Sequence, residues 1–133
     1  MNPEVQKMID HSFEYAQEIL IDTKEIYPFG AFIDTIGNVH PLEFDYNPKQ
    51  MPTVGKVMES LKTYCDGEIA ASRVKGYALA FEAELTLEEN KPAKTCIGIK
   101  LTHIEESNIP DFYMPFTNNE STVEFDAIFA VKP

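Results

Sequence analysis

Residues 77–84 read Tyr-Ala-Leu-Ala-Phe-Glu-Ala-Glu, a stretch in which large side chains alternate with small or charged ones. Because successive side chains of a strand point to opposite faces, this alternation predicts a β-strand that begins near residue 74. The polar residues 88–92 follow it, contain a proline and predict a turn. The apolar period of two therefore marks the start of a sheet-forming part of the chain.

Three further strands are predicted after this turn. The first covers residues 97–102, a short one lies around residues 111–116, and the last covers residues 123–131 with its alternate apolar side chains on one face. Pro110 and Pro115 interrupt the short strand. Because the connecting segments have the length of hairpin turns, the four strands are predicted to form an antiparallel meander.

Two amphipathic helices are predicted before the first of these strands. One covers about residues 3–25, with Asn2 as its N-cap and Pro3 at its first position. The other begins after its N-cap Thr53 and runs to about residue 70. Each has one apolar stripe at helical spacing, so each is expected to bury one face.

A β-hairpin is predicted between the two helices. Its strands are residues 29–34 and 39–44. Residues 37–38 (Gly-Asn) tolerate the left-handed backbone conformation that a tight hairpin turn requires. Pro41 has no amide donor, so the second strand is expected to lie at an edge of the sheet or to be broken at this residue. Residues 45–52 are dense in turn formers and predict a loop.

These elements define the predicted fold class as α+β, in the order α-β-β-α-β-β-β-β. Each helix has one apolar stripe, and the strands are mostly apolar on one face. We therefore expect the two helices to pack on one face of a mostly antiparallel sheet. A chain of 133 residues has room for one core, so residues 1–133 are predicted to form a single domain.

The order of elements resembles a group of small bacterial α+β proteins that has no assigned function. In that group an aromatic-Pro-Phe-Gly element follows the first helix, as residues 27–30 do here, and the other shared segments lie at residues 67–74, 97–103, 113–116 and 123–130. The shared elements are structural. The resemblance therefore implies this fold and carries no activity.

The composition excludes some classes of function. The chain has 22 acidic and 11 basic residues, a formal charge of −11, which argues against binding to nucleic acid or to an anionic membrane. The charge is spread evenly, because residues 1–66 hold 11 acidic and 5 basic residues and residues 67–133 hold 11 and 6. No signal peptide or membrane-spanning stretch is apparent, so a cytoplasmic protein is expected.

The residues that could bind a metal or act as nucleophiles are scattered. The histidines are His11, His40 and His103, and none has a His or Cys three or four positions away. Cys65 falls on the apolar stripe of the second helix. In the strand, Cys96 is out of phase with Ile97, whereas His103 is in phase with it. Cys96 and His103 are therefore expected on opposite faces of the sheet. No catalytic residue, metal site or cofactor is predicted.

Four carboxylates form the one acidic candidate. Glu82, Glu84, Glu124 and Asp126 occupy alternate positions of two predicted strands. If these strands were neighbours, the four groups would line one surface and could bind a hard cation or perform acid–base chemistry. A solvated back face of the sheet is the favoured alternative.

Aromatic and small residues form the other candidate. Tyr46, Phe112, Tyr113 and Phe116 lie in loops or short strands, where aromatic side chains commonly anchor partners. Their alternative is burial at the margin of the sheet. Small residues are also expected on the sheet face that the helices leave open, and these are Ala78, Ala80, Cys96 and Gly98.

These observations favour a non-catalytic binding or protein-interaction module over an enzyme. Its expected partner is a second copy of the chain, as a homodimer, or a basic protein. An immunity-type inhibitor of a basic toxin is a narrower alternative, because complementary charge accelerates association. A metal-assisted hydrolase that uses the strand carboxylates ranks third.

Overall fold

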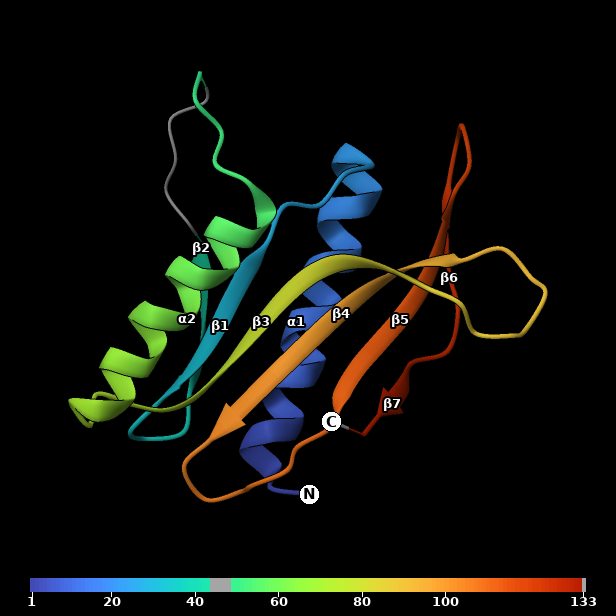
Figure 1. Cartoon of the computed structure of the whole chain (residues 1–133). Helices are drawn as coiled ribbons and strands as arrows, with labels where there is room; N and C mark the ends of the chain where they lie inside the picture. The colour runs from blue at the N-terminus through green and yellow to red at the C-terminus, as the bar shows by residue number, and fades with distance from the viewer. Residues whose placement is uncertain (44–48, 133) are drawn as a thin grey trace.

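The computed structural model describes residues 1–43 and 49–132, within which the chain forms two helices and a seven-stranded sheet (Figure 1). The elements follow one another as α1 (Pro3–Thr23), β1 (Phe29–Asp34), β2 (Val39–Glu43), α2 (Val54–Ala70), β3 (Val74–Leu85), β4 (Lys94–His103), β5 (Asp111–Asn118), β6 (Val123–Phe125) and β7 (Phe129–Val131). The predicted α+β class and both helices are confirmed. Phe44 and residues 45–48 of the predicted loop lie outside the described residues.

The two helices begin at the predicted caps. The Asn2 Oδ1 accepts the amide proton of Glu4 at 2.8 Å, and the Thr53 Oγ1 accepts that of Lys56 at 3.3 Å. The first helix ends at Thr23, two residues earlier than predicted, where Lys24 adopts a left-handed conformation with φ of 65°. Within the described residues, neither helix is long and apolar enough to cross a membrane.

The strand order is β2-β1-β3-β4-β5-β6, with β7 also paired to β5, and every pairing is antiparallel. The strand with Pro41 lies at an edge, as predicted. Because β2 and β3 both run antiparallel to β1, they are parallel to each other, and α2 makes the crossover that such a pair requires. The predicted four-strand meander is thus only part of a seven-stranded sheet.

The last predicted strand is divided in two, and this changes which way its residues face. Phe125 lies opposite Phe116, whereas Phe129 lies opposite Tyr113, so the two registers differ by one residue. The extra residue lies in the segment 126–128, where the Asp126 amide donates to the Pro115 carbonyl at 2.9 Å. A one-residue slip reverses the face of every later side chain. The prediction that residues 123–131 share one face is therefore wrong.

The prediction that both helices pack on one face is also wrong. Met8, Ile9 and Phe13 of α1 pack on the side of β3 that carries Ala78 and Ala80. The side chains of α2 pack on the opposite side, against Tyr77, Leu79 and Phe32. In Figure 1, α1 passes behind β3 and β4, whereas α2 passes in front of β2.

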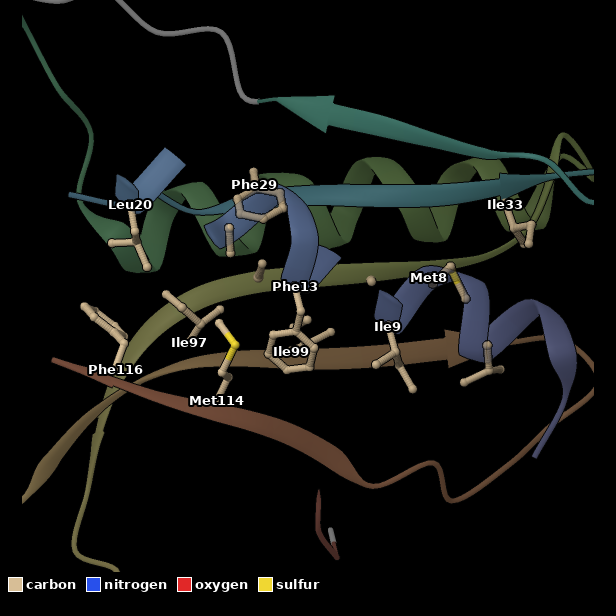
Figure 2. Packing of buried hydrophobic residues seen from close by; sticks show 14 residues of the cluster. Met8, Ile9, Phe13, Leu20, Phe29, Ile33, Ile97, Ile99, Met114 and Phe116 are labelled. Atoms are coloured by element: carbon tan, nitrogen blue, oxygen red, sulfur yellow. The ribbon is translucent and has the colours of Figure 1, made fainter. Parts of the chain in front are cut away.

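The reason lies in the composition of β3. Its residues from Gly76 to Ala80 are all buried, because the strand is apolar on both faces at that point. A strand that is covered on both sides reads as a continuous apolar run rather than as an alternation. The larger core is the one beneath α1, and Figure 2 shows Phe13 placed over Ile99 with Met114 beside it.

Candidate functional site: an aromatic row on the uncovered sheet face

The sheet face that carries α2 is only partly covered. The helix packs on the first half of β3, through Tyr77 and Leu79. Farther along the same face lie Phe81 of β3, Tyr113 of β5 and Phe129 of β7, which are half-buried and belong to neither core of the described residues. We call these three side chains the aromatic row.

The pairing of the strands aligns this row. Phe81 lies opposite Gly98, Gly98 opposite Tyr113, and Tyr113 opposite Phe129, which gives one line across four strands. The rings of Phe81 and Tyr113 meet edge to face at 6.5 Å, and those of Tyr113 and Phe129 stack at 5.8 Å. Both arrangements are favourable for aromatic pairs.

Gly98 allows the row to cross β4. A Cβ atom at this position would lie 2.7 Å from both the Phe81 Cζ and the Tyr113 Cε1. Glycine therefore leaves room for the two rings above the backbone, and the rings in turn cover the glycine. The row is continuous although β4 contributes no side chain to it.

The charged side chains around the row are paired. Lys100 Nζ lies 3.0 Å from Asp111 Oδ2 and 5.9 Å from the centre of the Phe81 ring. Lys94 Nζ lies 3.4 Å from Asp126 Oδ2 and donates to the Thr117 hydroxyl at 3.3 Å. These exposed pairs contribute little stability, but they offset two of the negative charges beside the row, where Glu124 of β6 also lies opposite Thr117 on the same face.

The structure does not bring the four candidate carboxylates together. Glu82 and Glu84 lie on β3, in phase with Ala80 and hence on the α1 side. Glu124 lies on β6 and faces the other way, because its neighbours Val123 and Phe125 pack against the α1 core. Two strands, β4 and β5, separate β3 from β6. No group of three or more His, Cys, Asp or Glu side chains in residues 1–43 and 49–132 is placed to hold a metal ion.

The four candidate aromatics have different fates. Tyr113 lies in the aromatic row, whereas Phe112 and Phe116 pack against the α1 core, as the alternative of burial at the sheet margin proposed. Tyr46 lies outside the described residues. Phe81 and Phe129 complete the row but are not sequence candidates. For Phe129 the reason is the register shift at residues 126–128, which turns its side chain to this face and can be recognised only from the pairing with β5.

The two thiols are poor nucleophiles. Burial raises the pKa of Cys65 to about 12, and burial also raises the pKa of Cys96. Only the thiolate form of cysteine is nucleophilic, and a thiol with a raised pKa stays protonated at neutral pH. Cys96 and His103 lie on opposite faces of the sheet, as predicted, since Cys96 alternates with Ile97 of the α1 core and His103 contacts Glu4 of α1.

His103 belongs to a partly buried polar cluster that joins α1 to the sheet. Its Nδ1 accepts the Glu105 amide proton at 3.0 Å, which leaves Nε2 to donate to Glu4 Oε1 at 2.8 Å. Glu4 Oε2 pairs with Lys75 Nζ at 2.8 Å. The His103 side chain has no exposed surface, so this imidazole holds α1 to the sheet and is not open to a substrate.

Comparisons with known proteins add no identity. No family model, curated protein or solved structure matches the chain.

Proposed function

We propose that this protein is a non-catalytic interaction module that pairs with a second copy of itself through the aromatic row. The observation that carries the proposal is the half-buried line of Phe81, Tyr113 and Phe129 on a sheet face that α2 leaves open. Aromatic side chains supply large contact areas at low entropy cost and dominate the energetics of many interfaces. Val131, which is 44% exposed, extends the apolar surface on the same face of β7.

The charge distribution favours a second copy as the occupant. Two molecules of formal charge −11 repel each other, so self-association needs a surface without excess negative charge. Lys100 and Lys94 reduce the negative charge beside the row, because they pair with Asp111 and Asp126 and leave Glu124 as the remaining carboxylate described on that part of the face. In a two-fold dimer the same patch faces itself, and a Lys–Asp pair is complementary to its own copy after rotation.

Catalysis is not part of the proposal. The thiols are buried with raised pKa values, and the carboxylates on which a metal-assisted hydrolase would depend lie on different faces and strands. The even spread of acidic residues likewise favours no focused patch for a basic toxin. Both thiols are free, which fits the reducing cytoplasm and makes that compartment part of the proposal.

The test is the mass of the protein in solution by sedimentation equilibrium. We expect a dimer for the wild type and at least a tenfold weaker association for Lys100→Glu, which makes the border of the row more negative. Tyr113→Ala removes the central ring and is expected to weaken the dimer similarly, with circular dichroism to confirm the fold. The matched control is Ile36→Ser, which removes an exposed apolar side chain from the β1–β2 turn and should leave the dimer unchanged.

Two outcomes would contradict self-association through this face. One is a wild type that stays monomeric at about 1 mM, where an association of only about 4 kcal/mol would be visible. The other is a dimer that is as strong in Lys100→Glu and Tyr113→Ala as in the wild type.

A further inference from the structure

A small cavity lies on the α2 side of the sheet, at the opposite end of β3 from the aromatic row. It has a volume of about 140 Å³ and is bounded by the last turns of α2, by β1 and by the start of β3. Its floor is apolar, formed by Phe32, Val74 and Cys65, of which Cys65 is 1% exposed. The remaining lining residues are Tyr64, Glu68 and Arg73, which form the mouth.

The cap of α2 builds this mouth. Ser72 takes a left-handed conformation with φ of 60°, its amide donates to the Ile69 carbonyl at 2.9 Å, and the Arg73 amide donates to the Glu68 carbonyl at 3.0 Å. This is the Schellman pattern, in which an apolar contact usually joins the two positions that Glu68 and Arg73 occupy. Here an ion pair between the two side chains replaces that contact.

The ion pair leaves Arg73 with a free edge, whereas Glu68, which is 16% exposed, accepts from two nitrogens of Arg73 and keeps only its remaining lone pairs for a ligand. The Arg73 Nε and Nη2 face Glu68, whereas Nη1 makes no hydrogen bond within the described residues, and the side chain is 66% exposed. The nearby guanidinium lowers the pKa of Glu68, so this carboxylate is charged at neutral pH. One positive and one negative group thus border an apolar floor.

Size and charge together select a ligand class. An apolar cavity of roughly 150 Å³ accepts one benzene ring, so this one has room for a branched aliphatic or phenyl side chain. A simple anion entering the mouth would meet Glu68 and a simple cation would meet Arg73. A zwitterion satisfies both, with its carboxylate on the free edge of Arg73 and its ammonium group on Glu68. It also carries no net charge toward a protein of formal charge −11.

We propose that this cavity binds a free apolar α-amino acid. The side chain enters the cavity over Phe32, Cys65 and Val74, and the zwitterionic head group lies between Glu68 and Arg73. The site is separate from the aromatic row and does not depend on the proposed dimer.

The experiment is a titration followed by two-dimensional amide NMR, with L-phenylalanine and L-leucine as probes. Phenylpropionate lacks the ammonium group and phenethylamine lacks the carboxylate, so each removes one half of the head group. We expect the two amino acids to shift the amides of residues 64–74, and each analogue to bind at least tenfold more weakly. L-Serine, which has no apolar side chain, should bind at least tenfold more weakly as well.

Two variants test the mouth directly. Arg73→Gln and Glu68→Gln each remove one charge from the surface and are expected to lower the affinity for L-phenylalanine at least tenfold. Glu88→Gln is the matched control, because it breaks the exposed pair with Lys91 far along the chain and should bind as the wild type does. The amide spectrum of each variant reports whether the fold is intact.

Three results would overturn the proposal. The amino acids could cause no shifts at residues 64–74, the analogues could bind as well as the amino acids, or binding could survive both charge-removing variants. None of these results bears on the oligomeric state, so failure here is distinguishable from failure of the proposed function.

Discussion

Gly76 fills a position in β3 where a larger residue would be overpacked. A Cβ atom there would lie 2.6 Å from the Thr102 carbonyl oxygen and 3.0 Å from the His103 Cδ2. The carbonyl belongs to the backbone of the neighbouring strand, and the histidine ring is held by Glu4 and the Glu105 amide. The ring cannot move without breaking these hydrogen bonds, and the carbonyl cannot move without disturbing the pairing of β3 with β4.

We therefore predict that Gly76→Ala destabilises the protein by about 1–3 kcal/mol, the usual cost of overpacking a core. The same substitution at Gly67 in α2, where a Cβ atom would meet nothing within 4 Å, should stabilise it by about 0.5–1 kcal/mol. Urea denaturation of both variants measures the two effects. Equal effects at the two positions would contradict the steric account.

Ser72 is a second residue whose backbone conformation sets a local cost. Its φ of 60° is the left-handed conformation that glycine adopts without strain. We predict that Ser72→Gly stabilises the protein by about 0.5–1 kcal/mol, since relief of strain outweighs the added entropy of the unfolded chain. Ser60→Gly is the control, because Ser60 is exposed inside α2 and glycine there should destabilise the helix. A thermal melt that shows the same sign for both would refute the expectation.

At the scale of whole elements, Glu4 ties α1 to two strands of the sheet. The hydrogen bond from Lys75, and then that from His103, lowers the pKa of Glu4 below its ordinary value of 4.5. A carboxyl whose pKa is lowered by folding stabilises the folded state above its unfolded pKa, and this contribution is lost as the pH falls through the folded value. The attachment of α1 is thus predicted to weaken in acid.

The prediction is tested by Glu4→Gln. We expect this variant to be less stable than the wild type by about 1–2 kcal/mol at neutral pH, and the difference to shrink as the pH falls below 4.5. Denaturation curves at several pH values give the difference directly. A Glu88→Gln control on the exposed turn pair should show no such trend, and a constant difference for Glu4→Gln would argue against an ionic role.

Local sequence signals predicted the elements but not the side of the sheet on which they pack. The caps Asn2 and Thr53 and the two apolar stripes were sufficient for the helices, because capping and periodicity are local properties. The face that each helix covers depends on strand β3, where Tyr77 and Ala78 are both buried on opposite sides. Because β3 is apolar on both of its faces, its local sequence does not indicate which helix packs on which face.

Across the whole molecule, the candidate site depended on long-range pairing. Tyr113 could be nominated from sequence, but its neighbours in the row come from strands more than 10 residues away in either direction. The same pairing separates Glu82 from Glu124, which the sequence allowed to meet. Strand order thus determines both what the uncovered face contains and which carboxylates never approach each other.

The two borders of the sheet have a consequence for the behaviour of concentrated solutions. An exposed strand with a continuous row of unpaired amides is a template for indefinite stacking into fibrils. At one border β2 contains Pro41, which donates no hydrogen bond, and at the other the chain is interrupted at residues 126–128 between two strands of three residues. Neither border offers a long template, so growth into fibrils is disfavoured and the molecule can expose an aromatic surface without polymerising along its strands.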